Sequence, residues 1–194
     1  MTTALIVVDV QNDFSEGGSL AVTGGNDVAR TIAEYVGADF SRAEGLGYDY
    51  VVATRDHHID PGEHFSDDPD FVDSWPRHCV AGTSGAEFNP AVANLPFHAV
   101  FDKGAYSAAY SGFEGTIGGT EDGEGLHAWL NQRGVLHVHV AGLATDHCVR
   151  ATALDAARLG YHSSVLLDLS APVSPERVPQ VIEELLNAQV LVTR

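Results

Sequence analysis

The sequence predicts an α/β protein of one domain, in which helices cover both faces of a parallel six-stranded sheet. Two observations indicate this class. Short apolar runs alternate along the chain with stretches of helical periodicity. In addition, a length of 194 residues and a hydrophobic content of 44% are typical of a single domain with a sizeable core. We therefore expect residues 1–194 to fold as one unit.

The six strands are expected where the apolar runs occur. Residues 4–8 form the clearest run, because no polar residue interrupts them, whereas a strand with one solvated face would alternate. Such a run indicates a strand that is covered on both faces. The predicted strands are residues 4–8, 49–54, 97–102, 135–141, 163–167 and 189–193.

Four helices are predicted from their caps and their periodicity. The first takes Asn26 as its N-cap and carries Val28, Ile32, Tyr35 and Val36 on one face. The others span about 124–133, stopped by Gly134; 145–160, ended by Gly160; and a last helix opened by Ser174 and Pro175.

Two segments show no regular pattern. Residues 55–96 are rich in Asp, His, Pro and Gly and are too long for an idle connection, so we expect them to be functional. Residues 111–125 are Gly-rich and acidic, but they lack the Gly-Lys-Ser/Thr ending of a phosphate-binding loop. We expect the second segment to be a mobile surface loop.

Charge and cysteine content restrict the possible partners. Ten basic against 27 acidic residues give a net charge of −17, which argues against nucleic acid and anionic membranes as partners. Neither a membrane span nor a leader peptide is recognisable, so we expect a cytoplasmic protein. Cys79 and Cys148 lie far apart in the sequence; one disulfide is possible, but free thiols are expected.

Three reactive side chains follow predicted strands. Asp9 ends the first, Lys103 follows the third, and Cys148 lies in the first turn of the helix after the fourth. Each has a plainer explanation by itself, as a turn residue, a solvated lysine or a small core residue. Because ligands of parallel α/β sheets bind beyond the carboxyl ends of the strands, however, all three are expected at the same edge. A helix N-terminus would also favour the Cys148 thiolate.

A second group combines a carboxylate with three imidazoles. Asp56 and His58 lie two residues apart at a strand end, and a Pro-Gly turn can bring His64 back toward them, with His78 further on. This set suits a divalent ion such as Zn, Fe, Mn or Co, although a polar surface loop is the alternative. The remaining histidines that we considered are expected to point away or to be structural: His57, His98, His137, His139 and, as a cap or support residue, His147.

Six short stretches resemble the motifs of nicotinamidases, within the isochorismatase-like cysteine hydrolases. They are 9–14 (DVQNDF), 54–58 (TRDHH), 60–65 (DPGEHF), 74–79 (SWPRHC), 103–106 (KGAY) and 142–149 (GLATDHCV). The resemblance extends from Leu5 to about Leu167. It is specific, since the wider superfamily often keeps the aspartate, lysine and cysteine but lacks the metal-binding set.

The resemblance implies a catalytic role for each matched residue. Cys148 would be the nucleophile, Asp9 would take its proton and deliver it to the departing ammonia, and Lys103 would hold both. The backbone N–H groups of Ala144 and Cys148 would form the oxyanion hole. The family also implies a cis peptide bond between Leu143 and Ala144.

The resemblance further implies a metal centre and a pocket for an aromatic ring. Asp56, His58, His64 and His78, within the loop region 55–96, would ligate one divalent ion, which is Zn, Fe or Mn. The ion would orient the pyridine nitrogen of the substrate. The substrate would be bound by Phe14 and Trp75, which stack on its ring, with Tyr110 and Leu143 nearby.

We therefore expect an isochorismatase-like hydrolase that converts nicotinamide to nicotinate and ammonia in NAD salvage, and that also acts on pyrazinamide. Its only partner would be a small aromatic carboxamide, and it would be a monomer or a small homo-oligomer. One alternative is a metal-independent relative that acts on a carbamoyl or ureido substrate. Another is a metal-binding or interaction protein that keeps the fold without turnover.

Overall fold

A computed structural model describes residues 1–41 and 47–194. In these residues, seven strands form a single sheet in the order β4-β3-β2-β1-β5-β6-β7. Every pair of neighbours is parallel except β3 and β4, which are antiparallel. The strands are β1 (Thr2–Val8), β2 (Tyr50–Asp56), β3 (Ala99–Lys103), β4 (Thr116–Ile117), β5 (Val135–Leu143), β6 (His162–Ala171) and β7 (Leu191–Thr193).

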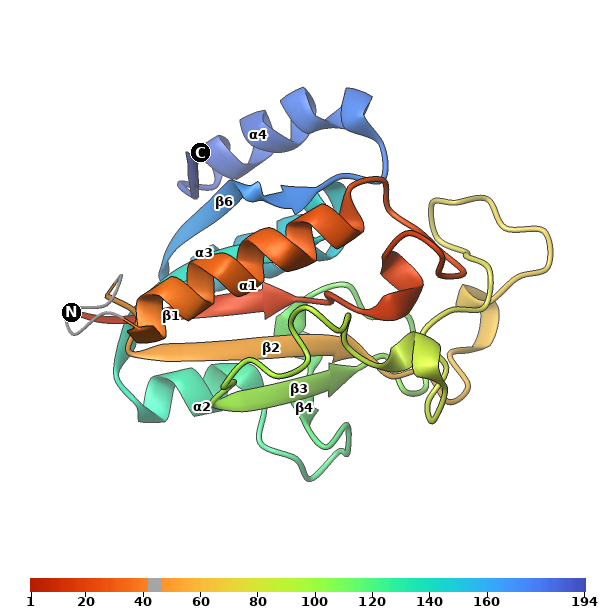
Figure 1. Ribbon diagram of the computed structural model, residues 1–194, viewed down its shortest axis with the longest axis horizontal. Coiled ribbons are helices and arrows are strands. Elements are labelled where there is room, and N and C mark those ends of the chain that lie inside the picture. The colour runs from red at the N-terminus through yellow and green to blue at the C-terminus, as the bar shows by residue number, and fades with distance from the viewer. Residues whose placement is uncertain (42–46) are drawn as a thin grey trace.

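Helices cover both faces of the sheet, as the alternating pattern predicted. α1 (Gly25–Ser41) lies on one face, whereas α2 (Leu126–Gln132), α3 (Arg150–Arg158) and α4 (Val178–Asn187) lie on the other (Figure 1). Alternate residues of β1 enter the two cores: Ile6 packs on the side of α2, α3 and α4, and Leu5 on the side of α1. The uninterrupted apolar run at residues 4–8 therefore reflects burial on both sides of the strand.

The sheet has one strand more than the sequence predicted. β4 lies within residues 111–125, where we expected only a mobile surface loop, and it pairs Thr116 with Asp102 and Ile117 with Phe101. Two residues are too few to show a periodicity of two along the sequence. Strand β4 forms because the fold places its backbone beside the edge of β3. This is a tertiary contact that the local sequence does not indicate.

The N-terminus of α1 also differs from the prediction. Asn26 is the second residue of the helix and not its N-cap. The carboxylate of Glu16 is present instead, and it accepts the N–H groups of Gly24 at 2.6 Å and Asn26 at 2.8 Å. A negative charge at this end of a helix is favourable because the helix dipole is positive there. The capping group thus comes from a loop ten residues upstream.

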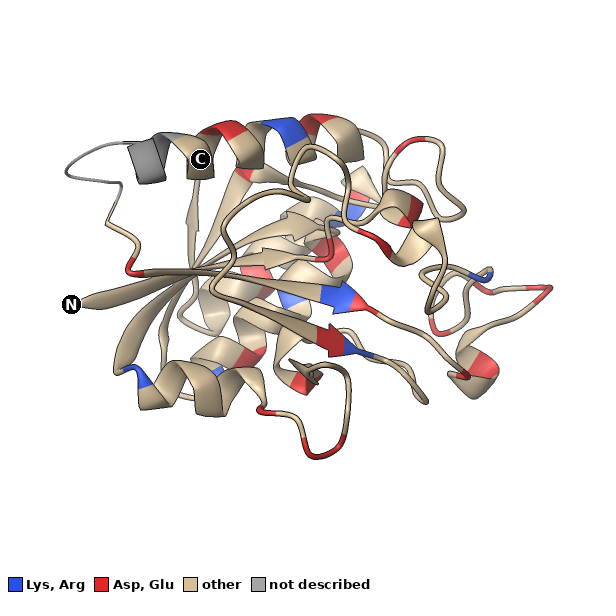
Figure 2. Ribbon diagram, turned by 60° about the horizontal axis from the view of Figure 1, so that its bottom comes forward, with Lys and Arg blue, Asp and Glu red and all other residues tan. Residues whose placement is uncertain are grey.

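The long segment between β2 and β3 first forms loops at the carboxyl edge of the sheet and then returns along the face covered by α1 to the start of β3 (Figure 1). Its regular structure is confined to two short 3₁₀ helices, Gly62–His64 and Ser84–Ala86, and a few isolated bridges. Asp and Glu positions are spread over helices, strand ends and loops of the described chain (Figure 2). Among the described residues, no helix is both long and apolar enough to cross a bilayer.

Candidate active site and metal centre

Three strand ends bring the predicted reactive side chains together. Asp9 follows β1 with a φ of 50°, which turns the chain away from the sheet, and Lys103 is the last residue of β3. Cys148 lies in a π-helical turn, Thr145–Val149, which connects β5 to α3. The Lys103 Nζ is 2.9 Å from Asp9 Oδ2 and 3.8 Å from Cys148 Sγ. We call these three residues, to which the motif resemblance assigns the catalytic roles, the catalytic trio.

Burial and charge oppose each other within the catalytic trio. Burial raises the pKa of Asp9, and the Lys103 ammonium only partly offsets this increase. Burial also raises the pKa of Cys148 well above its usual value, so the group at rest is a thiol that needs a base. Burial would lower the pKa of Lys103, but Asp56 and Asp9 outweigh it and keep the lysine charged. Thr54 Oγ1 completes the site by donating to Asp9 Oδ1 at 2.6 Å.

Asp56 links the trio to a group of histidines. One oxygen, Oδ1, contacts the Lys103 ammonium, and the other, Oδ2, lies 3.6 Å from His58 Nε2 and 3.9 Å from His78 Nε2. Burial favours the protonated acid, yet Lys103 and the two imidazoles lower its pKa below the usual range. Asp56 is therefore ionised and in contact with both groups.

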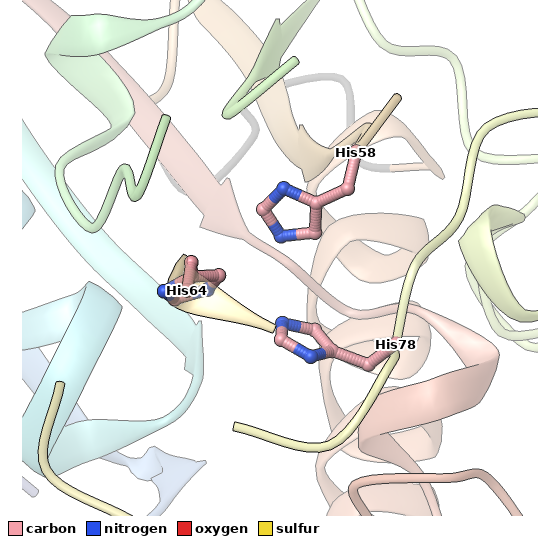
Figure 3. A group of neighbouring side chains, drawn as sticks. All are labelled: His58, His64 and His78. Atoms are coloured by element: carbon pink, nitrogen blue, oxygen red, sulfur yellow. The ribbon is translucent and has the colours of Figure 1, made fainter. Parts of the chain in front are cut away.

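His58, His64 and His78 form the histidine cluster, and their rings face a common centre (Figure 3). One nitrogen of each ring lies within 4.8 Å of the corresponding nitrogens of the other two. All three residues are buried, although they come from separate points of the loop between β2 and β3. The Pro-Gly turn does bring His64 back to His58, as the sequence predicted.

Backbone carbonyls orient two of these rings. His58 Nδ1 donates to the Gly104 carbonyl at 2.6 Å, and His78 Nδ1 donates to the Pro76 carbonyl at 2.7 Å. Since a carbonyl only accepts, each Nδ1 carries a proton, and Nε2 is the nitrogen that faces the other rings as a candidate ligand atom. Gly104 has a φ of 75°, and a Cβ there would lie 2.7 Å from His58 Cε1, so this close approach requires glycine.

The donor set fits a divalent metal ion. His58 Nε2 and His64 Nδ1 are buried and have no hydrogen-bond partner among the described residues, which is costly unless another ligand satisfies them. Burial lowers the pKa of His64 to about 4 and also lowers that of His78, so both rings are neutral and can coordinate. With the Asp56 carboxylate they supply ligands typical of zinc, iron or manganese.

A pocket opens beside the trio and the cluster. The four residues expected to contact a substrate all line it, namely Phe14, Trp75, Tyr110 and Leu143, as do Ala144 and Cys148. Trp75 Nε1 donates to the Tyr110 hydroxyl at 3.1 Å, which fixes two aromatic walls relative to each other. The Leu143–Ala144 peptide bond is cis, in agreement with the expectation.

Sequence reasoning missed part of the pocket wall. His147, expected to be a cap or support residue, lines the pocket, with its ring 5.1 Å from that of Trp75 and 6.3 Å from that of Tyr110. The side chains of neighbouring helical residues point about 100° apart. Both His147 and Cys148 nevertheless line the pocket, because it lies around the start of this helix. The apolar residues Leu20, Val22 and Val173 also line it, and no local signal in the sequence marks them.

The other cysteine and two of the remaining histidines have structural surroundings, as expected. Both thiols are free. Burial raises the pKa of Cys79 well above its usual value, and its backbone N–H donates to Asp13. His98 contacts the backbone of Val51, and His139 bonds the Tyr48 hydroxyl.

The fold and the site together define a class, the α/β proteins that carry an aspartate, a lysine and a cysteine side by side at the carboxyl edge of a mostly parallel sheet. Residues 3–194 match the Isochorismatase domain family, and the chain belongs to this family. It is 56% identical to the nicotinamidase/pyrazinamidase of Mycobacterium tuberculosis, over 96% of each chain.

Solved structures of similar proteins agree with this membership. The pyrazinamidase of Pyrococcus horikoshii in complex with zinc has a TM-score of 0.80 and 35% identity, with 100% of this chain and 99% of that chain covered. PnC1 from L. infantum in complex with nicotinate has a TM-score of 0.83 and 32% identity, covering 100% and 92%.

Proposed function

We propose that this chain hydrolyses nicotinamide to nicotinate and ammonia in NAD salvage, and that it also hydrolyses pyrazinamide. The observation that carries the proposal is the placement of Cys148 beside Lys103 and Asp9 at an aromatic pocket that also reaches the histidine cluster. The similarity to a nicotinamidase/pyrazinamidase over nearly the whole chain supports the substrate.

The first half of the reaction forms a thioester. Asp9 takes the proton from the Cys148 thiol, and Sγ attacks the carboxamide carbon. The oxygen that becomes negative is stabilised by the backbone N–H groups of Ala144 and Cys148. Asp9 then gives its proton to the nitrogen as the C–N bond breaks, and ammonia leaves. Lys103 remains charged and stabilises Asp9 and the sulfur while their charges change.

The second half of the reaction hydrolyses the thioester and regenerates the free cysteine. A water molecule gives a proton to Asp9 and attacks the thioester carbon, and the same backbone N–H groups stabilise the oxyanion. When the C–S bond breaks, Asp9 returns the proton to Cys148, and the product leaves as nicotinic acid, which loses its remaining acidic proton to water and becomes nicotinate. The raised pKa of Asp9 suits this exchange of protons. Burial brings the pKa of the carboxyl group closer to the pH at which it must both accept and donate a proton.

The metal would be held by Asp56, His58, His64 and His78 of the loop region 55–96, and the ion is zinc, iron or manganese. When bound, it supplies a Lewis acid toward the ring nitrogen of the substrate and so orients the ring. Phe14 and Trp75 stack on the ring, and Tyr110 and Leu143 complete the pocket. The histidine cluster also argues against a metal-independent relative that acts on carbamoyl or ureido groups.

The partner is a small, neutral aromatic carboxamide. We place the protein in the cytoplasm, as a monomer or a small homo-oligomer without nucleic-acid partners. The pocket agrees with this assignment, because its walls carry aromatic and apolar side chains suited to a ring, and the trio lies beside it.

Ammonia release from nicotinamide by the metal-replete protein tests the proposal. Cys148→Ala should reduce turnover at least about 10⁴-fold, because loss of a nucleophile removes the covalent route, and its metal content should stay that of the wild type. Cys79→Ala is the matched control, since it removes the other buried thiol and should keep the activity. An inactive wild type, or an active Cys148→Ala, would contradict the mechanism; release from a carbamoyl substrate alone would favour the relative.

A further inference from the structure

Gln11 is completely buried, and the mechanism above does not use it. Its side-chain Nε2 donates to the backbone carbonyls of Asp56 and Ala86, each at 2.8 Å. Its Oε1 accepts the backbone N–H of Asp56, also at 2.8 Å. Both peptide groups of the metal-ligand candidate Asp56 are thus bonded to one side-chain amide.

The Gln11 amide continues the hydrogen bonding between β1 and β2 beyond the point where the β1 backbone turns away from the sheet. β1 and β2 pair as far as Val8 and Thr54, and Asp9 adds a last bond to the Thr54 carbonyl at 3.2 Å. The chain then turns away at Asp9, with its φ of 50°. The Gln11 side-chain amide bonds both the N–H and the C=O of Asp56, the two groups that two successive β1 residues would bond if the parallel ladder continued.

The other side of the same strand is held by β3. The N–H of His57 donates to the Lys103 carbonyl at 2.9 Å, which continues the parallel pairing of β2 and β3 past Asp56. Asp56 is therefore fixed between Lys103 on one side and Gln11 on the other. Its carboxylate can place Oδ1 on the Lys103 ammonium and Oδ2 toward His58 and His78 only while the backbone keeps this orientation.

We infer that Gln11 is a positioning residue for the metal centre, acting through the backbone of Asp56. This inference rests on the assignment of Asp56 as a metal ligand in the proposed function. Side chains that orient metal ligands are worth about 10- to 100-fold in metal affinity. Replacing Gln11 with methionine, which has a similar shape but no such hydrogen bonds, should weaken metal binding by that factor.

Asn89 provides a matched control. It is also a buried amide that donates two hydrogen bonds, to Ser15 and Asn26, and accepts one, from Ala91. Its side-chain partners are outside the histidine cluster and the trio. Asn89→Leu therefore removes the same number of bonds, and it should lower stability without changing metal affinity.

The test measures Zn²⁺ affinity by competition with a chromophoric chelator for the full-length wild type, Gln11→Met and Asn89→Leu. The visible absorption of the Co²⁺-loaded proteins reports the ligand geometry independently of turnover. We expect a 10- to 100-fold weaker affinity and an altered Co²⁺ spectrum for Gln11→Met only. If Gln11→Met does not fold, Gln11→Glu is compared instead, since it keeps the acceptor for the Asp56 N–H but loses both donors; its Co²⁺ spectrum should differ from the wild type.

The outcomes separate this inference from the proposed function. A wild type that binds neither ion would overturn the metal assignment and the inference together. A wild type that binds Zn²⁺, with Gln11→Met equally tight or Gln11→Glu spectroscopically unchanged, would overturn the inference alone. Equal losses in Gln11→Met and Asn89→Leu would also overturn it, because they would show a general loosening of the fold.

Discussion

The catalytic trio and the histidine cluster lie at one pocket, but the chain builds them in different ways. Asp9 and Lys103 lie at the ends of β1 and β3, and Cys148 starts a helix, so rigid elements position all three. The histidines lie on a long loop, and backbone carbonyls orient His58 and His78. Within the trio, Lys103 forms an ion pair with Asp9, whereas in the cluster His58 Nε2 and His64 Nδ1 have no hydrogen-bond partner among the described residues.

This difference indicates which part of the site depends on a ligand. The sheet alone can hold the groups to which we assign the making and breaking of covalent bonds. The cluster needs a bound ion to satisfy its nitrogens. While no ion is bound, neighbouring groups must hold its rings in place. Lys103 and Asp56 are in direct contact, so the two groups share one ion pair, and their separation can be tested by substitution.

Among the substitutions that separate the trio from the cluster, the largest effect is expected from Lys103→Met. It leaves Asp9 and Asp56 without their buried counter-charge, so the free energy of unfolding should fall by about 3–5 kcal/mol. The turnover number should fall about a hundredfold or more, because a fixed charge near the reacting sulfur is lost. Metal content should be retained, since the histidines and Asp56 remain. Urea unfolding, ammonia release and metal analysis measure these three quantities.

Arg55→Met is the control for that experiment. Arg55 bonds Asp102 at 2.7 Å across the ends of β2 and β3, so it is also a strand-end cation, but it lies outside the pocket. Its loss should leave turnover unchanged and cost less stability, since it is partly exposed. A Lys103→Met protein with wild-type turnover would remove Lys103 from the mechanism.

His64→Ala is the reverse experiment, with the next largest effect. It removes a ligand from the cluster and leaves the trio intact, so the metal dissociation constant should rise more than about a hundredfold, and the substrate KM should rise with it. Alkylation of Cys148 by iodoacetamide, measured without metal, should proceed at the wild-type rate. Unchanged metal occupancy would exclude His64 as a ligand.

The smallest effect is expected from Gly104→Ala, which tests the orientation of a single ring. The added Cβ would press on His58 Cε1 at 2.7 Å in a backbone conformation with a φ of 75°. We expect a loss of about 1–3 kcal/mol in stability, as for other overpacked sites, together with weaker metal binding. Gly134→Ala is the control, because Gly134 has a φ of 63° and no atom of the described residues lies within 4 Å of its Cβ position.

Thermal unfolding and chelator competition distinguish the two glycine variants. Both should lose stability through backbone strain, but only Gly104→Ala should lose metal affinity. If both variants bind the ion as tightly as the wild type, the Gly104 carbonyl is not what orients His58. If both bind it more weakly, the effect reflects backbone strain in general.

Much of the fold was predictable because its signals are local. The apolar run at 4–8 required a strand buried on both faces. The rule that ligand-binding groups lie at the carboxyl ends of parallel strands predicted from the sequence that Asp9, Lys103 and Cys148 lie at one edge. The histidine cluster was predictable only as a choice between a metal site and a polar loop. Spacing within a loop does not determine which side chains converge, and the motif resemblance was needed to decide.

The sequence by itself determined the types of the elements, the edge at which the reactive groups gather and the residue types available there, since these depend on periodicity and chemistry over a few positions. Only the tertiary structure decided the contacts that join distant positions. Gln11 reaches Asp56 45 residues away, Glu16 replaces Asn26 as the cap of α1, and β4 forms against β3. The reason is physical. Each of these contacts exists because packing brings two distant segments of the chain together, and the local propensities of either segment do not determine that contact.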